Sequence, residues 1–225
     1  MKVTVIIPVK DEEETIENVL EGVRPYADSI LVVDGHSLDK TVQLAQKANV
    51  RVVSDNGGGK GDGYKVGMKE AGTEGVLVFM DGDGSHEASD IPKIVEPIKS
   101  GRAEVVIATR LKAGSDDIDA SISSFIRNIG GNLLTLLISL RFKVQLTDAL
   151  NGFRAIRADL GPWFIDNLVS NDFDVEHEMI MKALKKGWRV DEVPSHEYAR
   201  KGGRSKLPTY SKFYIFFWRL LVNLF

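Results

Sequence analysis

Two acidic residues, Asp81 and Asp83, directly follow the apolar segment Val76–Met80. This segment has the composition of a buried β-strand, so both carboxylates are expected at its carboxyl end. In an extended chain, residues two apart point to the same side, and Gly82 lets a ligand approach the main chain. Paired carboxylates attract Mg²⁺ or Mn²⁺, which prefer oxygen ligands together with phosphate groups. A metal site and a solvated turn rich in Asp and Gly both fit this pattern.

The glycine-rich segment Gly57–Gly61 contains Lys60 and precedes a helix predicted around Tyr64–Ala71. Main-chain amides of such a loop can bind phosphate oxygens, and Lys60 would add a positive charge. The segment is not a P-loop, because that motif requires glycine where Ser54 stands and serine or threonine where Gly61 stands. Phosphate binding and a plain flexible loop are alternative interpretations.

Further polar groups could complete a site for an anionic ligand. Asp34 ends another predicted strand and could bind a base or ribose, or cap a turn. Glu12 could take part in the same site or only face a helix dipole. The basic segment Arg200–Lys206 contains glycines that would let the chain fold so that its cations surround a diphosphate. Binding of a lipid headgroup and simple exposure to solvent are alternative interpretations. The carboxylates of Asp174–Glu178 could start a helix, or one could face a reaction centre.

Short apolar segments alternate with helical patterns along the chain. Strands are predicted at Val3–Ile7, Ser29–Val33, Val50–Val53, Val76–Met80 and Val105–Ala108. Helices are predicted at Thr15–Gly22, Thr41–Ala48 and Tyr64–Ala71. This alternation predicts an α/β fold with a mostly parallel sheet covered on both faces. Ligands of such sheets bind beyond the carboxyl ends of the strands, here Pro8–Glu12, Asp34–Asp39, Gly57–Lys60 and Asp81–Ser85.

The composition excludes several classes of protein. The 225 residues are 43% hydrophobic and 27% charged, which argues against disorder, and one domain with a C-terminal extension is the simplest division. The net charge of −3 gives no global attraction to nucleic acid, and no nucleic-acid partner is expected. The absence of cysteine excludes disulfides, thiolate metal sites and a cysteine nucleophile.

Two apolar segments are too short or too polar to span a membrane. In Ile122–Leu140, apolar residues recur at helical spacing, which fits an interfacial helix or ordinary core packing. Phe213–Leu221 is rich in aromatic residues and carries Arg219, a composition typical of a membrane interface. We expect no secretory signal, because Lys10 soon follows the first apolar segment.

Together these segments resemble the family 2 glycosyltransferases with the GT-A fold, most closely the dolichol-phosphate mannose synthase subgroup, which makes polyprenyl-phosphate sugars. The resemblance runs from Val3 to about Leu207. It is carried by Ile6–Val9 with Glu12, Val32–Asp34 with Ser37, Asp39 and Thr41, Gly59–Gly61, Met80–Asp83, Asp148 with Asn151–Ala155, and Glu192–Pro194 with Arg200–Lys206. Each segment is a weak signal, but six in the family's order are a strong one.

The resemblance implies a Rossmann-like GT-A catalytic domain over residues 1–207. The aromatic-rich composition of residues 208–225 predicts an amphipathic helix at a membrane interface after it. It implies an inverting transfer of a hexose from a GDP- or UDP-sugar to a polyprenyl (dolichyl) phosphate, with Mg²⁺ or Mn²⁺ on Asp81 and Asp83. The donor would contact Pro8, Val9, Glu12, Asp34, Lys60, Asp81, Gly82, Arg200 and Lys206. The acceptor phosphate would contact Arg110, Arg127 or Arg154, and Arg154 is assigned with Asp81 and Asp83 to catalysis. The enzyme would lie on the cytoplasmic face of a membrane.

The sequence also departs from the family. Gly35 stands where the family usually has a second acid beside Asp34, and His36 replaces glycine. Ser85 stands where the subgroup often has a metal-binding glutamine, and Glu87-Ala88 replaces Pro-Pro. These differences affect the residues that are expected to determine the nucleobase preference and to supply the third metal ligand. Transfer to a soluble acceptor and nucleotide-sugar binding without turnover are the alternative functions; a nucleotidyltransferase shares the architecture but not the C-terminal motifs.

Overall fold

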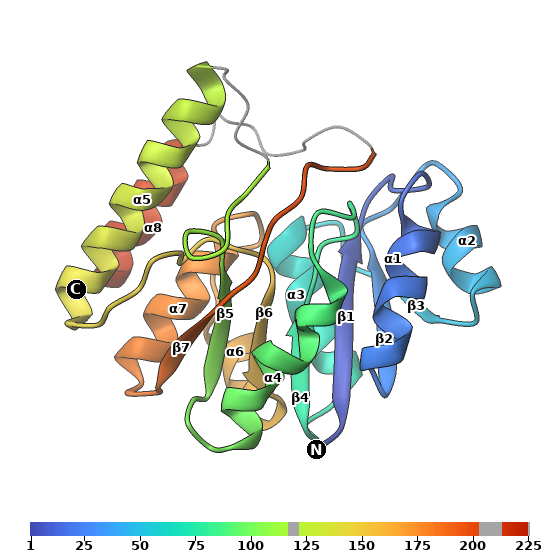
Figure 1. Ribbon diagram of the computed structural model, residues 1–225, viewed down its shortest axis with the longest axis horizontal. Helices are drawn as coiled ribbons and strands as arrows, with labels where there is room; N and C mark the ends of the chain where they lie inside the picture. Colours follow the sequence, from blue (N-terminus) through green and yellow to red (C-terminus); the bar gives the residue numbers. More distant parts are fainter. Residues whose placement is uncertain (117–121, 203–212, 225) are drawn as a thin grey trace.

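The computed structural model describes residues 1–116, 122–202 and 213–224, and its centre is a seven-stranded sheet (Figure 1). The strands lie in the order β3-β2-β1-β4-β6-β5-β7. Their bounds are Val3–Val9 (β1), Ser29–Asp34 (β2), Arg51–Ser54 (β3), Val76–Phe79 (β4), Val105–Thr109 (β5), Arg154–Arg157 (β6) and Val190–Pro194 (β7). Only the pairs that β6 forms with β4 and β5 are antiparallel among these strands. The predicted α/β fold with a mostly parallel sheet is confirmed.

Helices cover both faces of the sheet, as Figure 1 shows. Their bounds are Ile16–Val23 (α1), Thr41–Lys47 (α2), Lys60–Ala71 (α3), Ile91–Lys99 (α4), Ile122–Phe142 (α5), Gly161–Asn167 (α6), Val175–Lys185 (α7) and Phe213–Leu224 (α8), with 3-10 turns at Arg24–Tyr26, Ala88–Asp90 and Ala158–Leu160. One apolar cluster joins the sheet to α1, α2 and α4, and the other joins it to α3, α5, α6 and α7. In α1, for example, Ile16, Val19, Leu20 and Val23 are buried at helical spacing.

The strand register aligns the polar strand ends at one edge of the sheet. Val9 at the end of β1 pairs with Asp34 at the end of β2, and Asp34 pairs with Ser54 at the end of β3. On the other side of β1, Ile6 pairs with Phe79, the last residue of β4. The segments after these four strands therefore meet at one edge, which is where the sequence predicts a ligand site.

The C-terminal helix α8 lies beside α5 and packs on α7 (Figure 1). Leu220 is buried, Phe216 stacks on His177 with ring centroids 5.3 Å apart, and Arg219 Nε donates to Asp174 Oδ2 at 2.6 Å. Burial lowers the pKa of His177 to about 4, although the Asp174 carboxylate acts in the opposite direction. A neutral imidazole therefore packs at this interface at neutral pH.

Both α5 and α8 also present an apolar stripe to solvent. We define the α5 stripe as Ile129, Leu133, Leu136 and Leu140, and the α8 stripe as Trp218, Leu221 and Val222; all of these side chains are exposed. Their spacing places each set on one face of its helix. None of the helices that the structure describes is long and apolar enough to cross a bilayer.

Candidate active site

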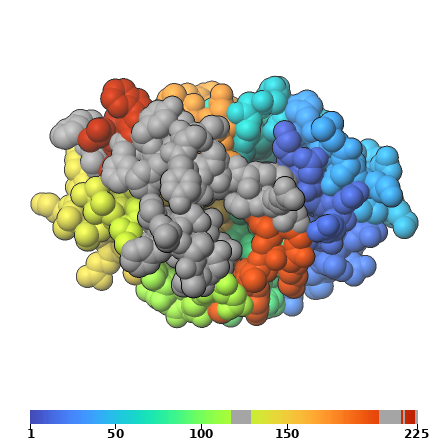
Figure 2. All heavy atoms as spheres, turned by 90° about the horizontal axis from the view of Figure 1, so that it is seen from above, coloured from blue at the N-terminus to red at the C-terminus, as the bar shows by residue number. Residues whose placement is uncertain are grey.

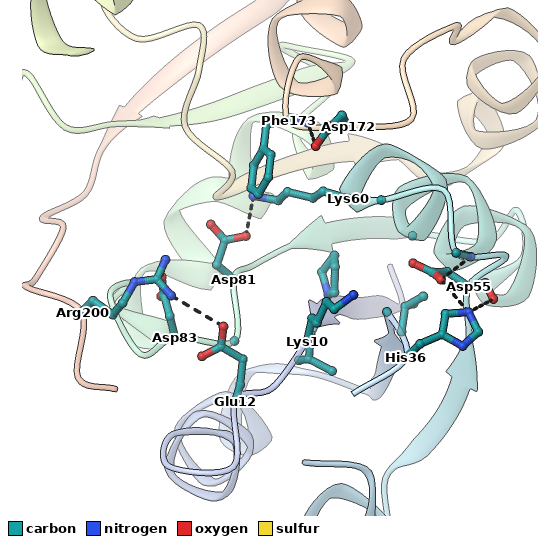
Figure 3. A pocket seen from close by; sticks show the side chains of 18 residues that line it. Lys10, Glu12, His36, Asp55, Lys60, Asp81, Asp83, Asp172, Phe173 and Arg200 are labelled. Carbon is teal, nitrogen blue, oxygen red and sulfur yellow. Dashed lines mark hydrogen bonds and ion pairs between the residues drawn. The ribbon is translucent and has the colours of Figure 1, made fainter. Parts of the chain in front are cut away.

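A cavity of about 450 Å³ opens at the carboxyl ends of β1, β2 and β4 (Figure 3). The segment after β3, the start of α3, the segment before α7 and Arg200 complete its wall. Residues from these seven parts of the chain thus converge on one space, because the parallel register brings the strand ends together. Of the predicted site residues, the cavity is lined by the predicted metal ligands Asp81 and Asp83 and by Pro8, Val9, Glu12, Lys60, Gly82 and Arg200.

Asp81 and Asp83 follow β4 and each contacts a cation. Asp81 Oδ1 lies 2.7 Å from Lys60 Nζ, and Asp83 Oδ2 lies 2.8 Å from the Arg200 guanidinium (Figure 3). The Ser85 hydroxyl donates to Asp83 Oδ1 at 2.6 Å and fixes that carboxylate. His86 is buried, with Nε2 3.4 Å from Asp81 Oδ2. Lys60 and His86 therefore favour the ionised form of Asp81, and Ser85 and Arg200 hold the Asp83 carboxylate in place.

Lys60 is the first residue of α3 and lies between two carboxylates. Its Nζ is 2.7 Å from both Asp81 Oδ1 and Glu176 Oε1, and both Lys60 and Glu176 are largely buried. Although burial opposes charge, Asp81 and Glu176 raise the pKa of Lys60 well above its ordinary value. Burial raises the pKa of Glu176, whereas the pKa of Asp81 is lowered because Lys60 and His86 together outweigh the effect of burial. Lys60 is thus a fixed positive charge at the cavity wall.

The glycine segment before α3 packs against the chain around Asn171. A Cβ at Gly59 or Gly61 would lie 2.7 Å from a main-chain oxygen of Asn171 or Ser170. The amides of Gly61 and Asp62 donate to the Asn171 carbonyl at 2.9 and 3.3 Å. These two amides are used within the protein, so the predicted phosphate cradle does not include them. The glycines are needed because the two segments approach so closely.

Comparison with known proteins identifies the family. The sequence model described as glycosyl transferase family 2 matches residues 4–160, more than half of the chain. The chain belongs to this family. It is therefore a glycosyltransferase, and the resemblance expected from its motifs is confirmed.

Relatives of this glycosyltransferase differ in the reactions that their names describe. Glycosyltransferase AglJ of Haloferax volcanii is 29% identical over 89% of this chain, which spans 64% of AglJ. An undecaprenyl-phosphate mannosyltransferase of Micrococcus luteus is 31% identical over 92% of this chain and 88% of its own length. A UDP-N-acetylglucosamine–dolichyl-phosphate N-acetylglucosaminyltransferase of Methanococcus voltae is 24% identical over 93% of this chain and 92% of its own length.

Solved structures share the fold of this glycosyltransferase. Glucosyl-3-phosphoglycerate synthase of Mycobacterium tuberculosis, in complex with Mn²⁺, UDP and glucosyl-3-phosphoglycerate, superimposes with a TM-score of 0.78. The match covers 99% of this chain and 80% of that one at 21% identity. At this identity the likeness establishes the GT-A architecture alone.

The remaining predicted site residues of the glycosyltransferase do not line the cavity within the described residues. Both Asp34 carboxylate oxygens accept from the Ser37 amide at 3.1 and 3.3 Å, so Asp34 caps the turn after β2. Arg110 Nε donates to Asp148 at 2.6 Å, and its guanidinium lies 3.3 Å from Glu197. Arg127 has no described side chain, and Lys206 lies outside the described residues.

Arg154 needs a correction, because its side chain is fully buried. Its guanidinium donates to the main-chain carbonyls of Asn151 and Glu176. An arginine enclosed by carbonyl oxygens cannot reach an acceptor phosphate in this arrangement, so the predicted catalytic and phosphate-binding roles do not fit its position. Arg154 instead joins the end of the 148–153 segment to the start of α7, which carries Glu176.

Several cavity residues were not assigned from the sequence. Asp55 and His36 follow β3 and β2, and Asp172 and Phe173 precede α7. Asp55 is the second residue after the predicted strand Val50–Val53, so the rule that ligands bind beyond strand ends would have found it. Phe173 lies over Lys60, with Nζ 5.8 Å from its ring centroid. Nothing in the local sequence pattern distinguishes Phe173 from a core residue.

The acidic pair fits the divalent metal that this family suggests. Within the described residues, no three Asp, Glu or His side chains could hold a metal ion on their own. The two available carboxylates already attract cations, and Asp81 retains access to the cavity. Two hard oxygen ligands suit Mg²⁺ or Mn²⁺ when the other positions are taken by water and a diphosphate. Ser85 supports Asp83 by a hydrogen bond, in place of the glutamine of the subgroup.

Proposed function

We propose that this enzyme transfers a hexose, with inversion, from a nucleotide sugar to a polyprenyl phosphate, and that the reaction requires Mg²⁺ or Mn²⁺. One observation carries the proposal: Asp81 and Asp83 lie with Lys60 and Arg200 on the wall of a single cavity large enough for a nucleotide. Two carboxylates and two cations are the groups that a metal-bound diphosphate leaving group requires. The relatives that use undecaprenyl or dolichyl phosphate support the choice of acceptor.

The side chains stabilise charge rather than supply a strong base. As the bond to the anomeric carbon breaks, negative charge grows on the diphosphate, and Lys60 and Arg200 offset it. The bound metal would add Lewis-acid stabilisation of the same leaving group on Asp81 and Asp83. An acceptor phosphate is already an anion, so it can attack the opposite face of the sugar without prior deprotonation.

We propose that the enzyme acts at the surface of a membrane, on its cytoplasmic face. The α5 and α8 stripes provide seven exposed apolar side chains, among them Trp218, at one end of the molecule. In Figure 2, α5 and α8 lie at the opposite end from α1 and α2. Because α8 packs on α7, and α7 carries Glu176 beside Lys60, a lipid bound at the α8 stripe would contact a helix that adjoins the cavity wall.

Adding a charge to either stripe should weaken binding to lipid vesicles. We expect Trp218→Glu and Leu140→Glu each to reduce partitioning onto phosphatidylglycerol-containing liposomes by about 10-fold or more, since burying a large apolar side chain contributes about 1.5–3 kcal/mol. Co-sedimentation measures the bound fraction. Leu38→Glu is the matched control, because Leu38 is 94% exposed in the segment before α2. Equal sedimentation of all these variants and the wild type would contradict membrane binding through the stripes.

The transfer reaction itself is tested with labelled donors. The enzyme is incubated with Mn²⁺ or Mg²⁺, dolichyl phosphate and labelled GDP- and UDP-sugars, and label is followed into the organic phase. We expect label in the lipid that disappears when a chelator is added. If labelled donor binds but no lipid is labelled, while a soluble phosphorylated acceptor is, the acceptor proposed here is wrong. Donor binding without transfer to any acceptor would indicate a binding protein without turnover.

A further inference from the structure

Asp55 lies at the opposite side of the cavity from the acidic pair. In Figure 3, Asp55 and His36 lie on one side, and Asp81, Asp83 and Arg200 lie on the other. The Asp55 amide donates to the Asp34 carbonyl at 3.0 Å, which holds the residue next to the end of β2. If the donor diphosphate lies at the acidic pair, its nucleoside must extend toward Asp55, since these groups share one cavity.

The two oxygens of the Asp55 carboxylate have different surroundings. Among the described residues, its side-chain contacts involve Oδ1, which accepts from the Gly57 amide at 2.8 Å and lies 3.3 Å from His36 Nε2. Oδ2 lies between two glycines: a Cβ would be 3.5 Å away at Gly35 and 3.7 Å away at Gly63. Side chains at these positions would contact Oδ2 at van der Waals distance. Asp55 and both glycines line the cavity, so a nearly buried hydrogen-bond acceptor lies at its wall.

This arrangement compensates for a departure in the sequence. Gly35 stands where the family usually has a second acid, and the Asp55 carboxylate reaches to within 3.5 Å of the place where that side chain would begin. An acid at the end of β3 thus supplies a carboxylate to the region that an acid at the end of β2 would occupy. His36, another departure, contacts the same carboxylate through Nε2.

We propose that Asp55 recognises the nucleobase of the donor and selects uracil; this inference rests on the proposed nucleotide-sugar donor. A carboxylate oxygen only accepts hydrogen bonds, so the facing ring position must carry an N–H. Uracil has one at N3, whereas cytosine N3 and adenine N1 present lone pairs that would repel Oδ2. Guanine presents two adjacent donors, N1–H and the 2-amino group, which match a carboxylate with both oxygens available. Here Gly57 and His36 take Oδ1, which favours the single donor of uracil.

Binding of UDP, GDP, CDP and ADP in the presence of Mn²⁺, measured by calorimetry, tests the proposal. For the wild type we expect UDP to bind at least about 10-fold more tightly than the other three nucleotides. A buried polar group without a matching partner lowers the affinity by about 10-fold or more. In Asp55→Asn, the amide can donate to cytosine N3, so CDP should gain affinity while UDP loses about 10-fold. A purely structural role for Asp55 would not reverse the order of two bases.

The control is Asp62→Asn. Asp62 accepts from the Gly58 amide and stabilises the same loop, but it does not line the cavity, so this variant should retain the preference for UDP. Tighter binding of GDP than UDP by the wild type, or an equal loss of all four nucleotides in Asp55→Asn, would overturn the inference while leaving the proposed transfer intact. If no nucleoside diphosphate bound at all, the proposed donor would itself be wrong.

Discussion

Replacing Asp83 with asparagine should lower the rate of hexose transfer by about 10²–10³-fold while the protein remains folded. The carboxylate contributes a negative charge for the metal-bound diphosphate and positions Arg200 at 2.8 Å, and an amide of the same shape provides neither. Ser85 can still donate to the amide oxygen, so local packing is preserved. Initial rates at increasing Mn²⁺, compared with thermal unfolding of the same samples, separate lost chemistry from lost structure.

Asp90→Asn is the control for this substitution. Asp90 is another buried acid after β4, paired with Lys93, but it does not line the cavity. We expect this variant to transfer hexose at the wild-type rate. Unchanged turnover by Asp83→Asn at saturating metal would remove Asp83 from the metal assignment. If both variants lost activity and also lost cooperative unfolding, the loss of activity would be explained by a damaged fold instead of by missing chemistry.

The buried, apolar strands are the part of the fold that can be predicted from the sequence. β1, β2, β4 and β5 are apolar, and their composition alone predicts them. β6 is harder to predict, because it begins with Arg154, whose buried guanidinium donates to the carbonyls of nearby Asn151 and of Glu176 in α7. β7 is an edge strand whose residues are only partly buried, and it carries Asp191 and Glu192. Neither strand has the continuous apolar pattern from which a strand is normally predicted.

The site is predictable to the extent that strand ends define it. Asp81, Glu12 and Lys60 follow from the rule for parallel sheets and from the family motifs. The partner that gives Lys60 its raised pKa does not, because Glu176 reaches Lys60 only through the tertiary packing of α7. For Arg154 the motif misleads: it predicts a phosphate ligand, whereas the side chain is fully buried inside the protein. Motifs thus indicate which residues matter but not which atoms face the substrate.

Replacing Lys60 with methionine should lower the free energy of unfolding by about 3–5 kcal/mol, in addition to reducing transfer. Methionine has a similar length but no charge, so Asp81 and Glu176 would face each other without the cation that now lies 2.7 Å from each. Urea denaturation measures the loss. Folding already raises the pKa of Glu176, and loss of Lys60 should raise it further. An acid with a raised pKa stabilises the folded state once protonated, so the deficit should shrink as the pH falls from about 8 to 5.

Adding Glu176→Gln to Lys60→Met isolates the electrostatic part of this effect. The double variant has no buried charge opposite Asp81, so we expect it to recover more than half of the lost stability at pH 8, with little further change on acidification. Transfer should stay low, because the positive charge beside the diphosphate is still missing. Equal stability of the single and double variants would show that Lys60 acts by packing on Phe173 rather than by separating the two carboxylates. Recovery of stability without activity would instead assign Lys60 two roles: neutralising buried acids in the free enzyme and stabilising the leaving group during transfer.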